Sequence, residues 1–592
     1  MNVPTMKTNK TNIIAALALA IFLMATAGCS KKSNTTPPPI NPGGPGGGTP
    51  GTDSVYKPTD PASPAATIGF FLDDWKAKTF TAPATTAGTV ATSSVSDALT
   101  INLNNVITKV PTYVYGNNSN LWTGTYVGNT ALVGYIKDLA PNIIRAPAGS
   151  VSDVYFWNGT DANGSPADAP SYAGGYWHGG NAGNWTLSLT NYYSLLSQTN
   201  STGIITINYG YARYGTSANP VATAAHLAAD WVRYDNGRTK FWEIGNETYG
   251  NWEAGYSIDQ SQNKDGQPAT ITGALYGNHV KVFADSMRAA ALETGAKIYI
   301  GASLIDAPAY NGAYPALGTW NQGVIANAAS TVDYFIIHDY FTAYNTNSSV
   351  SDILNTAAVV PTTGLNYVKS QLAAAGATQK PVALTEWNIQ AIGSRQDISY
   401  VAGMHAAKAL GSIIKNQFGE ASRWDLANAW SNNSPAVNGD DQGMFSYSQP
   451  GIPDGNPRAQ YYYMYYFQKF FGDRMVSDSL TSFNGDLTTY SSTFTSGQAG
   501  TIIINSGTLS HTLSIDFQHF PAGNNYYWYV LTGGTDNGNF SAQVFVNGTG
   551  PANGQGGPLN YGTLQAYSAP LTGTIKLSVP PLSVVYLVAD KK

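Results

Sequence analysis

The segment that decides the fold reads TKFWEIGNE, residues 239–247. Its aromatic and branched residues predict a short buried strand, after which the sequence changes abruptly to an amide and a carboxylate. With strict alternation, Glu243, Gly245 and Glu247 lie on one face of that strand. An acid at the carboxyl end of a strand, with a small residue behind it, is typical of catalysis in a parallel barrel. The alternative is a solvated loop acid that follows a core strand.

Seven further apolar runs of strand length recur along the chain, with helical or loop segments between them. Buried strands that alternate with helices predict parallel βα units, and eight such units predict a (β/α)8 barrel. The competing fold is an open, doubly wound sheet. It would carry a Gly-rich phosphate-binding turn after its first strand, and the sequence has none there. The runs are IGFFL at 68–72, NIIRAPAG at 142–149, GIITINYG at 203–210, IYIGAS at 298–303, YFIIHDY at 334–340, PVALTEWN at 381–388 and RWDLANAW at 423–430.

Helical spacing of apolar residues occurs over 220–234, 276–294 and 398–417, and a last helix is expected over 460–471. From about residue 477 the residue pattern changes to short β-rich runs separated by Gly and Asn turns, which predicts a β-sandwich. The expected divisions are a signal peptide at 1–28, a tether at 29–64, a catalytic barrel at 65–472 and a β-sandwich at 473–592.

The N-terminal segment predicts a lipoprotein. Lys7 and Lys10 precede an apolar run at 13–27 that is too short for a comfortable membrane span and has the flanks of a signal peptide. The run ends in small residues before Cys29, the only cysteine of the chain, and so resembles a bacterial lipobox. A Pro-, Gly-, Ser- and Thr-rich stretch follows and cannot build a core. We therefore expect a lipid anchor on Cys29 in a bacterial cell envelope. The alternative is an ordinary secreted protein.

Composition narrows the range of partners. Only 11% of the 592 residues are charged and the net charge is -5, so no basic field for nucleic acid is expected. Aromatic residues reach 12%, which fits either an aromatic core or rings that stack on the apolar C–H faces of sugars. No zinc spacing such as His-Glu-x-x-His occurs, and the expected chemistry needs neither a metal ion nor a cofactor.

The polar residues at the predicted strand ends form one constellation. In a barrel they meet at the carboxyl ends of the strands, where Glu247 on strand four faces Glu386 on strand seven. Glycoside cleavage needs such a pair, one carboxylic acid for the leaving oxygen and one carboxylate as nucleophile. Arg145 and the phenol of Tyr340 are expected to keep Glu386 ionised, and Glu243 is expected to pair with Arg145 from below.

Three motifs carry a resemblance to the clan A glycoside hydrolases: IGNE at 244–247, TEWN at 385–388 and His338-x-Tyr340. The resemblance covers about residues 68–472 and is nearest to the family 51 α-L-arabinofuranosidases, with families 39, 44 and 79 related. The run RAPAG at 145–149 departs from the Arg-x-Pro-Gly-Gly expected in family 51, because Ala148 stands at a glycine position.

The resemblance implies a retaining (β/α)8 barrel with Glu247 as general acid/base and Glu386 as nucleophile. It further implies that Asn246 bonds the sugar hydroxyl beside the anomeric carbon. The remaining implied roles are orientation of Glu386 by Arg145 and Tyr340, and a sugar subsite lined by His338 and Trp430.

Two classes of function follow for a carbohydrate ligand. The first is a membrane-anchored retaining glycosidase acting on plant or algal polysaccharides or oligosaccharides, either an exo-acting arabinofuranosidase or an endo-β-glycanase of glucan or xylan. The second is a carbohydrate-binding lipoprotein without turnover. The presence of both glutamates favours the enzyme, because a binding protein needs no matched acid and nucleophile.

Overall fold

The computed structural model describes residues 58–121, 126–159, 165–170, 178–179 (backbone only), 187–308, 317–390, 393–431, 441–551 and 554–592. The predicted signal peptide, Cys29 and most of the predicted tether lie outside the described residues. Within them, no helix is both long and apolar enough to cross a membrane. The end of the predicted tether is anchored on the fold, because Asp60 pairs with Lys109 and Arg474.

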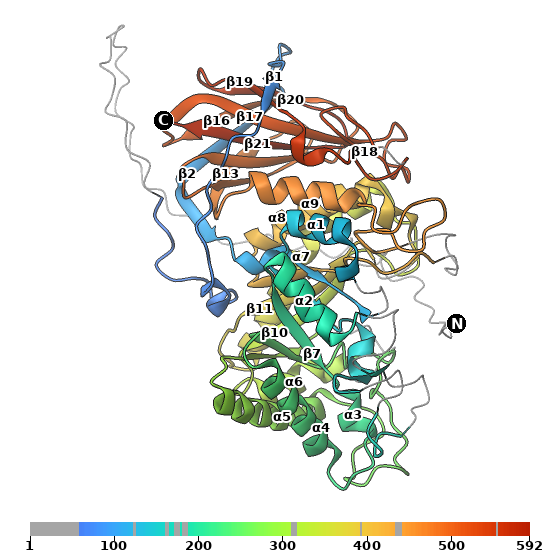
Figure 1. The fold of residues 1–592 in the computed structure, drawn as a ribbon. Helices are drawn as coiled ribbons and strands as arrows, with labels where there is room; N and C mark the ends of the chain where they lie inside the picture. The colour runs from blue at the N-terminus through green and yellow to red at the C-terminus, as the bar shows by residue number, and fades with distance from the viewer. Residues whose placement is uncertain are drawn as a thin grey trace, which may run out of the picture. The chain divides into compact units, whose positions relative to one another are not determined.

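Eight parallel strands close into a barrel and helices surround it, which confirms the predicted fold (Figure 1). The order around the barrel is the order along the chain, so strand four faces strand eight and strand seven is three places from strand four. The strands are β3 (Gly116–Asn118), β4 (Ile143–Ala146), β7 (Thr202–Ile207), β8 (Phe241–Ile244), β9 (Tyr299–Ser303), β10 (Tyr334–Tyr340), β11 (Val382–Asn388) and β12 (Glu420–Arg423).

The helices follow the strands as βα units. Apolar stripes account for them: α4, for example, starts with Pro at its first position and an Asn219 cap, and buries Ala224, Ala228 and Trp231. The helices are α1 (Thr130–Leu139), α2 (Leu189–Thr199), α3 (Gly210–Tyr214), α4 (Pro220–Asp235), α5 (Gly273–Thr294), α6 (Trp320–Ala328), α7 (Val350–Ala374), α8 (Tyr400–Lys415) and α9 (Ala459–Phe470).

The predicted first strand is wrong. IGFFL forms a 3-10 helix, η1 (Gly69–Leu72), and the first barrel strand is instead β3, with the sequence GNN. A strand without apolar residues escapes a hydrophobic search. Its Gly116 is required by packing, because a Cβ there would lie 2.4 Å from Ser422 Oγ. The predicted eighth strand is also displaced, since β12 ends at Arg423, where the prediction began.

The η1 segment closes the amino-terminal end of the barrel. Phe71 stacks on Phe241 and contacts Tyr334 edge-on, with ring centroids 5.1 and 5.6 Å apart. Asp73 and Asp74 therefore lie at this end, where they pair with Lys297 and Lys240 rather than with the carboxyl-end residues. The buried apolar cluster comprises Ile68, Phe71, Tyr113, Ile143, Ile204, Phe241, Tyr334, Ile336 and Ala383.

The C-terminal region folds as the predicted sandwich, built on one eleven-stranded sheet that curls over its own core. Its strands are β13 (Arg474–Thr481), β14 (Leu487–Thr493), β15 (Ala499–Asn505), β16 (His511–Gln518), β17 (Ala522–Gly533), β18 (Val544–Val546), β19 (Ala566–Pro570), β20 (Ile575–Val579) and β21 (Ser583–Lys591), joined by β1 (Thr85–Ala87) and β2 (Asp97–Lys109).

The two N-terminal strands correct the expected domain boundary. β2 lies between β13 and β16 in the sheet, although its residues were assigned to the barrel segment 65–472. Its burial alternates along the strand, with Leu99, Ile101 and Leu103 inside. That alternation is the pattern of a strand with one buried face, not of a parallel barrel strand buried on both faces. The sandwich is therefore assembled from both ends of the described chain.

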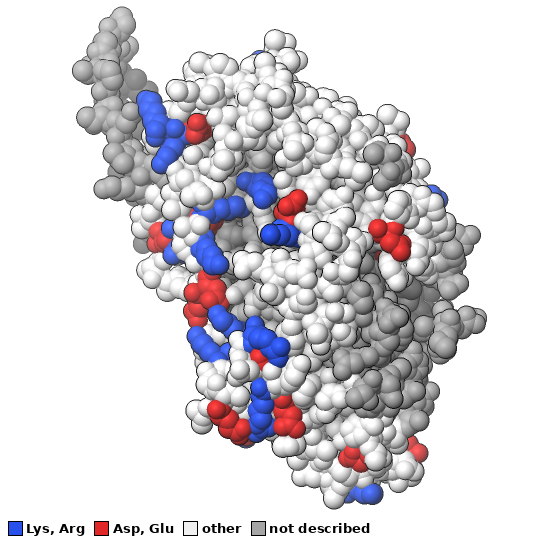
Figure 2. Space-filling model, viewed as in Figure 1, with Lys and Arg blue, Asp and Glu red and all other residues white. Residues whose placement is uncertain are grey.

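Both faces of the sandwich's central strands are covered. Along β21, Val585 and Leu587 pack into the sandwich core, whereas Val584, Tyr586 and Val588 belong to the core shared with the barrel. The phenol of Tyr586 donates to the Tyr463 carbonyl in α9 at 2.8 Å. A small two-stranded sheet, β5 (Tyr155–Phe156) with β6 (His178–Gly179), lies outside both sheets. Figure 2 shows positive and negative side chains interleaved along one edge of an otherwise sparsely charged face.

Candidate active site

Arg145, on β4, organises the carboxyl end of the barrel. Its side chain is fully buried, and its Nε donates to Glu243 Oε2 at 2.6 Å. Nη1 donates to Glu386 Oε1 at 2.8 Å, and Nη2 donates to Asn246 Oδ1 at 2.7 Å. The predicted pairing with Glu243 is present, and Thr206 donates a further hydrogen bond to the same Glu243 oxygen. The planar guanidinium thus holds two acids, Glu243 of strand four and Glu386 of strand seven, and the amide of Asn246 that follows strand four.

Glu386 lies at the end of β11 and is the more deeply enclosed of the two candidate acids. Its side chain is 5% exposed, against 16% for Glu247. Besides the Arg145 bond to Oε1, Tyr340 donates its phenol proton to Oε2 at 2.8 Å. Two donors, one of them cationic, therefore hold both oxygens of the Glu386 carboxyl group in fixed positions.

Glu247 follows β8 in a tight turn. The strand ends at Ile244, and both Gly245 (φ 74°) and Glu247 (φ 38°) take left-handed conformations. A Cβ on Gly245 would lie 2.6 Å from Thr248 Cγ2, so only glycine fits without a shift. Because the turn breaks the predicted alternation, Asn246 does not point to the opposite face from Glu247. It bonds Arg145 inside the site.

Three donors surround the Glu247 carboxylate. Trp252 Nε1 donates to Oε2 at 2.8 Å, Tyr249 donates to Oε1 at 3.3 Å, and His338 Nδ1 lies 3.2 Å from Oε1. Burial by itself raises the pKa of Glu247, but the hydrogen bond and charge of His338, with the Trp252 and Tyr249 bonds, bring it below its ordinary value. The free site therefore holds Glu247 as an acceptor of hydrogen bonds.

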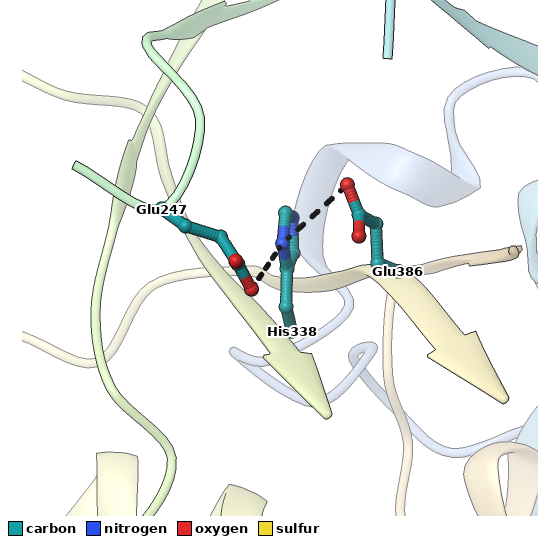
Figure 3. A group of neighbouring side chains, drawn as sticks. All are labelled: Glu247, His338 and Glu386. Atoms are coloured by element: carbon teal, nitrogen blue, oxygen red, sulfur yellow. Dashed lines mark hydrogen bonds and ion pairs between the residues drawn. The ribbon is translucent and has the colours of Figure 1, made fainter. Parts of the chain in front are cut away.

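His338, on β10, stands between the two acids (Figure 3). Its Nδ1 is 3.2 Å from Glu247 Oε1 and 3.7 Å from Glu386 Oε1, and its Nε2 is 2.9 Å from Thr385 Oγ1. Burial lowers the pKa of His338, but the charge of Glu386 and the bond to Glu247 raise it above the ordinary value. The imidazole lies close to both acids: one carboxylate oxygen of each acid and one ring nitrogen of His338 lie within 4.8 Å of one another.

The structure thus brings together six of the seven predicted site residues of the barrel: Glu247, Glu386, Asn246, Arg145, His338 and Tyr340. The seventh, Trp430, is half-buried beyond the end of β12, where its backbone N–H donates to the Tyr447 carbonyl. Its place in a sugar subsite stays a prediction. Trp387, which follows Glu386 in the chain, is fully buried, and its ring stacks near that of Phe341.

Several functional residues escaped the sequence search. Trp252 and Tyr249 bond the candidate acid, and Asn118 on the polar strand β3 accepts from Arg145 Nη1 at 3.1 Å. Trp424, at the end of β12, packs its ring over Gly149, where a Cβ would lie 2.6 Å from the indole. Ala148 beside it has φ 65°, so the turn that normally requires glycine is built here with alanine. Of these residues, only Trp252 could have been suspected from the sequence, because it lies close to Glu247 in the chain.

Comparison with solved structures shows the same fold in glycoside hydrolases. An α-L-arabinofuranosidase from Thermotoga maritima, solved as an arabinose complex, is 15% identical, with a TM-score of 0.57 over 83% of this chain and 99% of that one. The family 51 arabinofuranosidase of Xanthomonas axonopodis pv. citri is 15% identical, with a TM-score of 0.55 over 84% and 100%. A family 44 xyloglucanase from Paenibacillus polymyxa is 11% identical, with a TM-score of 0.54 over 84% and 100%.

No protein-family model matches this chain, and no curated protein matches it. At these identities the structural matches establish the fold. The predicted barrel-and-sandwich architecture of the family 51 resemblance is confirmed at that level.

Proposed function

We propose that this protein is a retaining glycoside hydrolase of the clan A type that acts on plant or algal polysaccharides or oligosaccharides. The observation that carries the proposal is the pair Glu247 and Glu386, which have carboxylate oxygens within 4.8 Å of each other. Retaining enzymes hold their two carboxyl groups about 5–5.5 Å apart, and inverting enzymes about 6.5–9.5 Å apart to admit a water. The spacing supports double displacement.

In this mechanism Glu386 attacks the anomeric carbon while Glu247 gives a proton to the leaving oxygen, and a glycosyl–Glu386 ester forms. Arg145 and Tyr340 stabilise the Glu386 carboxylate before attack. Once the ester has formed, that negative charge is gone. Glu247 then takes a proton from water, which attacks the ester and releases the sugar with its configuration retained.

The proton for the first step must reach Glu247, which the free site keeps ionised. His338 supplies the physical route, because its Nδ1 lies 3.2 Å from Glu247 Oε1 and its pKa is raised. When a sugar fills the space between the acids, the carboxylate of Glu247 loses water and its pKa rises. A shared proton on the His338–Glu247 pair would then move to the acid.

The arabinofuranosidase assignment is supported by the sequence motifs and by the arabinofuranosidases among the similar structures. A second candidate, an endo-β-glycanase, is favoured by the xyloglucanase and by CelM2, a bifunctional glucanase-xylanase protein with a TM-score of 0.53. The fold is common to both.

The test is hydrolysis of a panel of aryl glycosides and polysaccharides by the full-length protein, compared with Glu386→Ala and Glu247→Ala. Arabinose release that both variants abolish would support the exo-acting assignment, and oligosaccharides from glucan or xylan would move it to the endo-glycanase. Azide should restore turnover of an activated substrate in both variants, giving products of opposite anomeric configuration. Binding without turnover would overturn the enzyme proposal and leave the carbohydrate-binding protein.

We also propose a lipid anchor on Cys29, which rests on the sequence alone. Growth with labelled palmitate should label the full-length protein and leave Cys29→Ser unlabelled. Equal labelling of both would overturn the proposal, and unlabelled wild type would favour the secreted alternative.

A further inference from the structure

A further acid, Glu253, lies behind Asn246 in the loop that carries the candidate acid/base. Its side chain is buried in the loop that follows β8, and it bonds neither Arg145 nor Glu247 directly. Its Oε1 accepts two hydrogen bonds, from Ser150 Oγ at 2.8 Å and from Asn246 Nδ2 at 3.0 Å. Within the described residues Oε2 has no hydrogen-bond partner. A buried carboxyl oxygen without a partner calls for an explanation.

Asn246 is held at both ends of its amide. Oδ1 accepts from Arg145, which has no acceptor of its own, and Nδ2 donates to Glu253. A flipped amide would place its NH2 group against the guanidinium, so the two partners admit one orientation. Nδ2 carries two hydrogens, and Glu253 takes one of them. The other remains for the sugar hydroxyl that Asn246 is proposed to bind.

The surroundings of Glu253 disfavour its ionised form. The groups that face it are Asp153 and Ser150 from η5 (Ser150–Val154) and Asn246 and Glu247 from its own loop. Two of these are acids, and no Lys or Arg pairs with Glu253 among the described residues. Burial first, and then the charges of Asp153 and Glu247, raise the pKa of Glu253 well above its ordinary value. A proton on Oε2 removes the charge and leaves Oε1 as the acceptor.

We propose that Glu253 is a positioning residue that acts as a neutral carboxylic acid and fixes the amide of Asn246 in the orientation that glycoside cleavage requires. The inference rests on the proposed function, because the contribution of Asn246 is made to the sugar. A neutral acid with one accepting oxygen is matched in shape and polarity by glutamine. That equivalence separates this role from one in which the negative charge of Glu253 matters.

The kinetic test compares Glu253→Gln and Glu253→Ala with the wild type on the substrate found by the panel. Glu253→Gln should keep kcat within about twofold, whereas Glu253→Ala should lose about 10- to 100-fold in kcat with little change in KM, because the misplaced amide acts mainly in the transition state. Ser150→Ala should show a smaller loss of the same kind. Glu293→Ala removes an exposed ion pair with Arg233 on the outside of the barrel and serves as the matched control.

Two results would overturn the proposal: Glu253→Gln as impaired as Glu253→Ala, or Glu253→Ala as active as the wild type. A pH profile adds a readout that a packing role would not change. Glu253→Gln should extend the alkaline limb of kcat/KM, or leave it in place, and should not shift it to lower pH.

Failure of the proposed function is recognised separately, because it appears as absence of turnover in the wild type. The infrared spectrum of the wild-type protein then still tests the protonation state. A carbonyl stretch of a protonated carboxyl group at pH 7 that disappears in Glu253→Gln supports the neutral acid. An unchanged protonated-carboxyl region in Glu253→Gln overturns it.

Discussion

The two ends of the barrel are made by the same eight strands but follow opposite physical rules. At the amino-terminal end, η1 inserts Phe71 among Phe241 and Tyr334, and exposed ion pairs such as Lys297–Asp73 lie at its rim. At the carboxyl end, the buried side chains are Arg145, three glutamates and their hydrogen-bond partners. One end stores stability in apolar contacts. The other holds buried charges that cost stability unless all are paired.

The comparison separates residues that are expected to stabilise the barrel from residues that are expected to act in catalysis. Substitutions at the apolar end should change the free energy of unfolding and leave catalysis intact. Substitutions at the charged end should change catalysis far more than stability, except where they leave a buried charge without its partner. The four predictions below test this separation, from the largest expected effect to the smallest.

Replacing Arg145 with Met should damage both properties. Glu243 and Glu386 would be left as buried carboxylates without their cation, which costs about 3–5 kcal/mol of stability. Asn246 and Glu386 would also lose their common donor, so kcat should fall by at least about 10²–10³-fold. Denaturant unfolding and steady-state kinetics measure the two effects. Asp73→Asn, which breaks the exposed pair with Lys297 at the other end, is the control, and it should cost at most about 1 kcal/mol.

Replacing Phe71 with Ala should destabilise the barrel by about 3–5 kcal/mol, because it opens a cavity among the stacked rings. We expect kcat at 25 °C to stay within about twofold of the wild type as long as the protein is folded. A large loss of kcat in folded Phe71→Ala would show that the two ends are coupled.

Replacing Tyr340 with Phe removes one hydrogen bond to Glu386 Oε2 and little else. A hydrogen bond to a charged group contributes about 1.5–3 kcal/mol, so we expect kcat to fall by about 10- to 100-fold. The melting temperature should change little, since the ring and its packing remain. A large drop in melting temperature with an unchanged kcat would show that Tyr340 stabilises the fold and does not assist catalysis.

The pair His338 and Glu247 should give a pH-dependent stability. The pKa of His338 is raised above 6.5, so its contribution is full below pH 6.5 and is lost as the pH rises through the raised value. The pKa of Glu247 is lowered below 4.5, so its contribution is present above pH 4.5 and is lost as the pH falls through the lowered value. The difference in melting temperature between wild type and His338→Gln should therefore be greatest between about pH 4.5 and 6.5. A difference that grows above pH 8 would contradict the pairing.

The strands that sequence reasoning located are those whose residues are buried on both faces. The runs at 203–210, 298–303 and 334–340 are nearly continuous in apolar residues. β9 and β10 lie within their runs, and β7 begins one residue before its run. β3 was missed because its Gly and Asn residues serve close packing and the Arg145 network. IGFFL was assigned wrongly because an apolar run of strand length looks the same when it plugs a barrel as when it forms one.

The site shows the same division. Glu247, Glu386, Asn246, Arg145, His338 and Tyr340 could be chosen from the sequence because parallel strands deliver the residues at their ends to one edge of the barrel. Glu253 and Asn118 could not, because an acid in a loop and an amide in a short polar run carry no signal of burial. Their roles arise from neighbours far away in the chain.

The sequence by itself determined the periodicity of the elements, the identity of the two opposing glutamates and the change from barrel to sandwich. These properties follow from local patterns that repeat along the chain. Only the tertiary structure decided that β2 joins the C-terminal sheet, that η1 closes the barrel and that Glu253 stands behind Asn246. Those facts depend on contacts between distant residues, because a buried polar side chain is defined by the partners that pay for its desolvation.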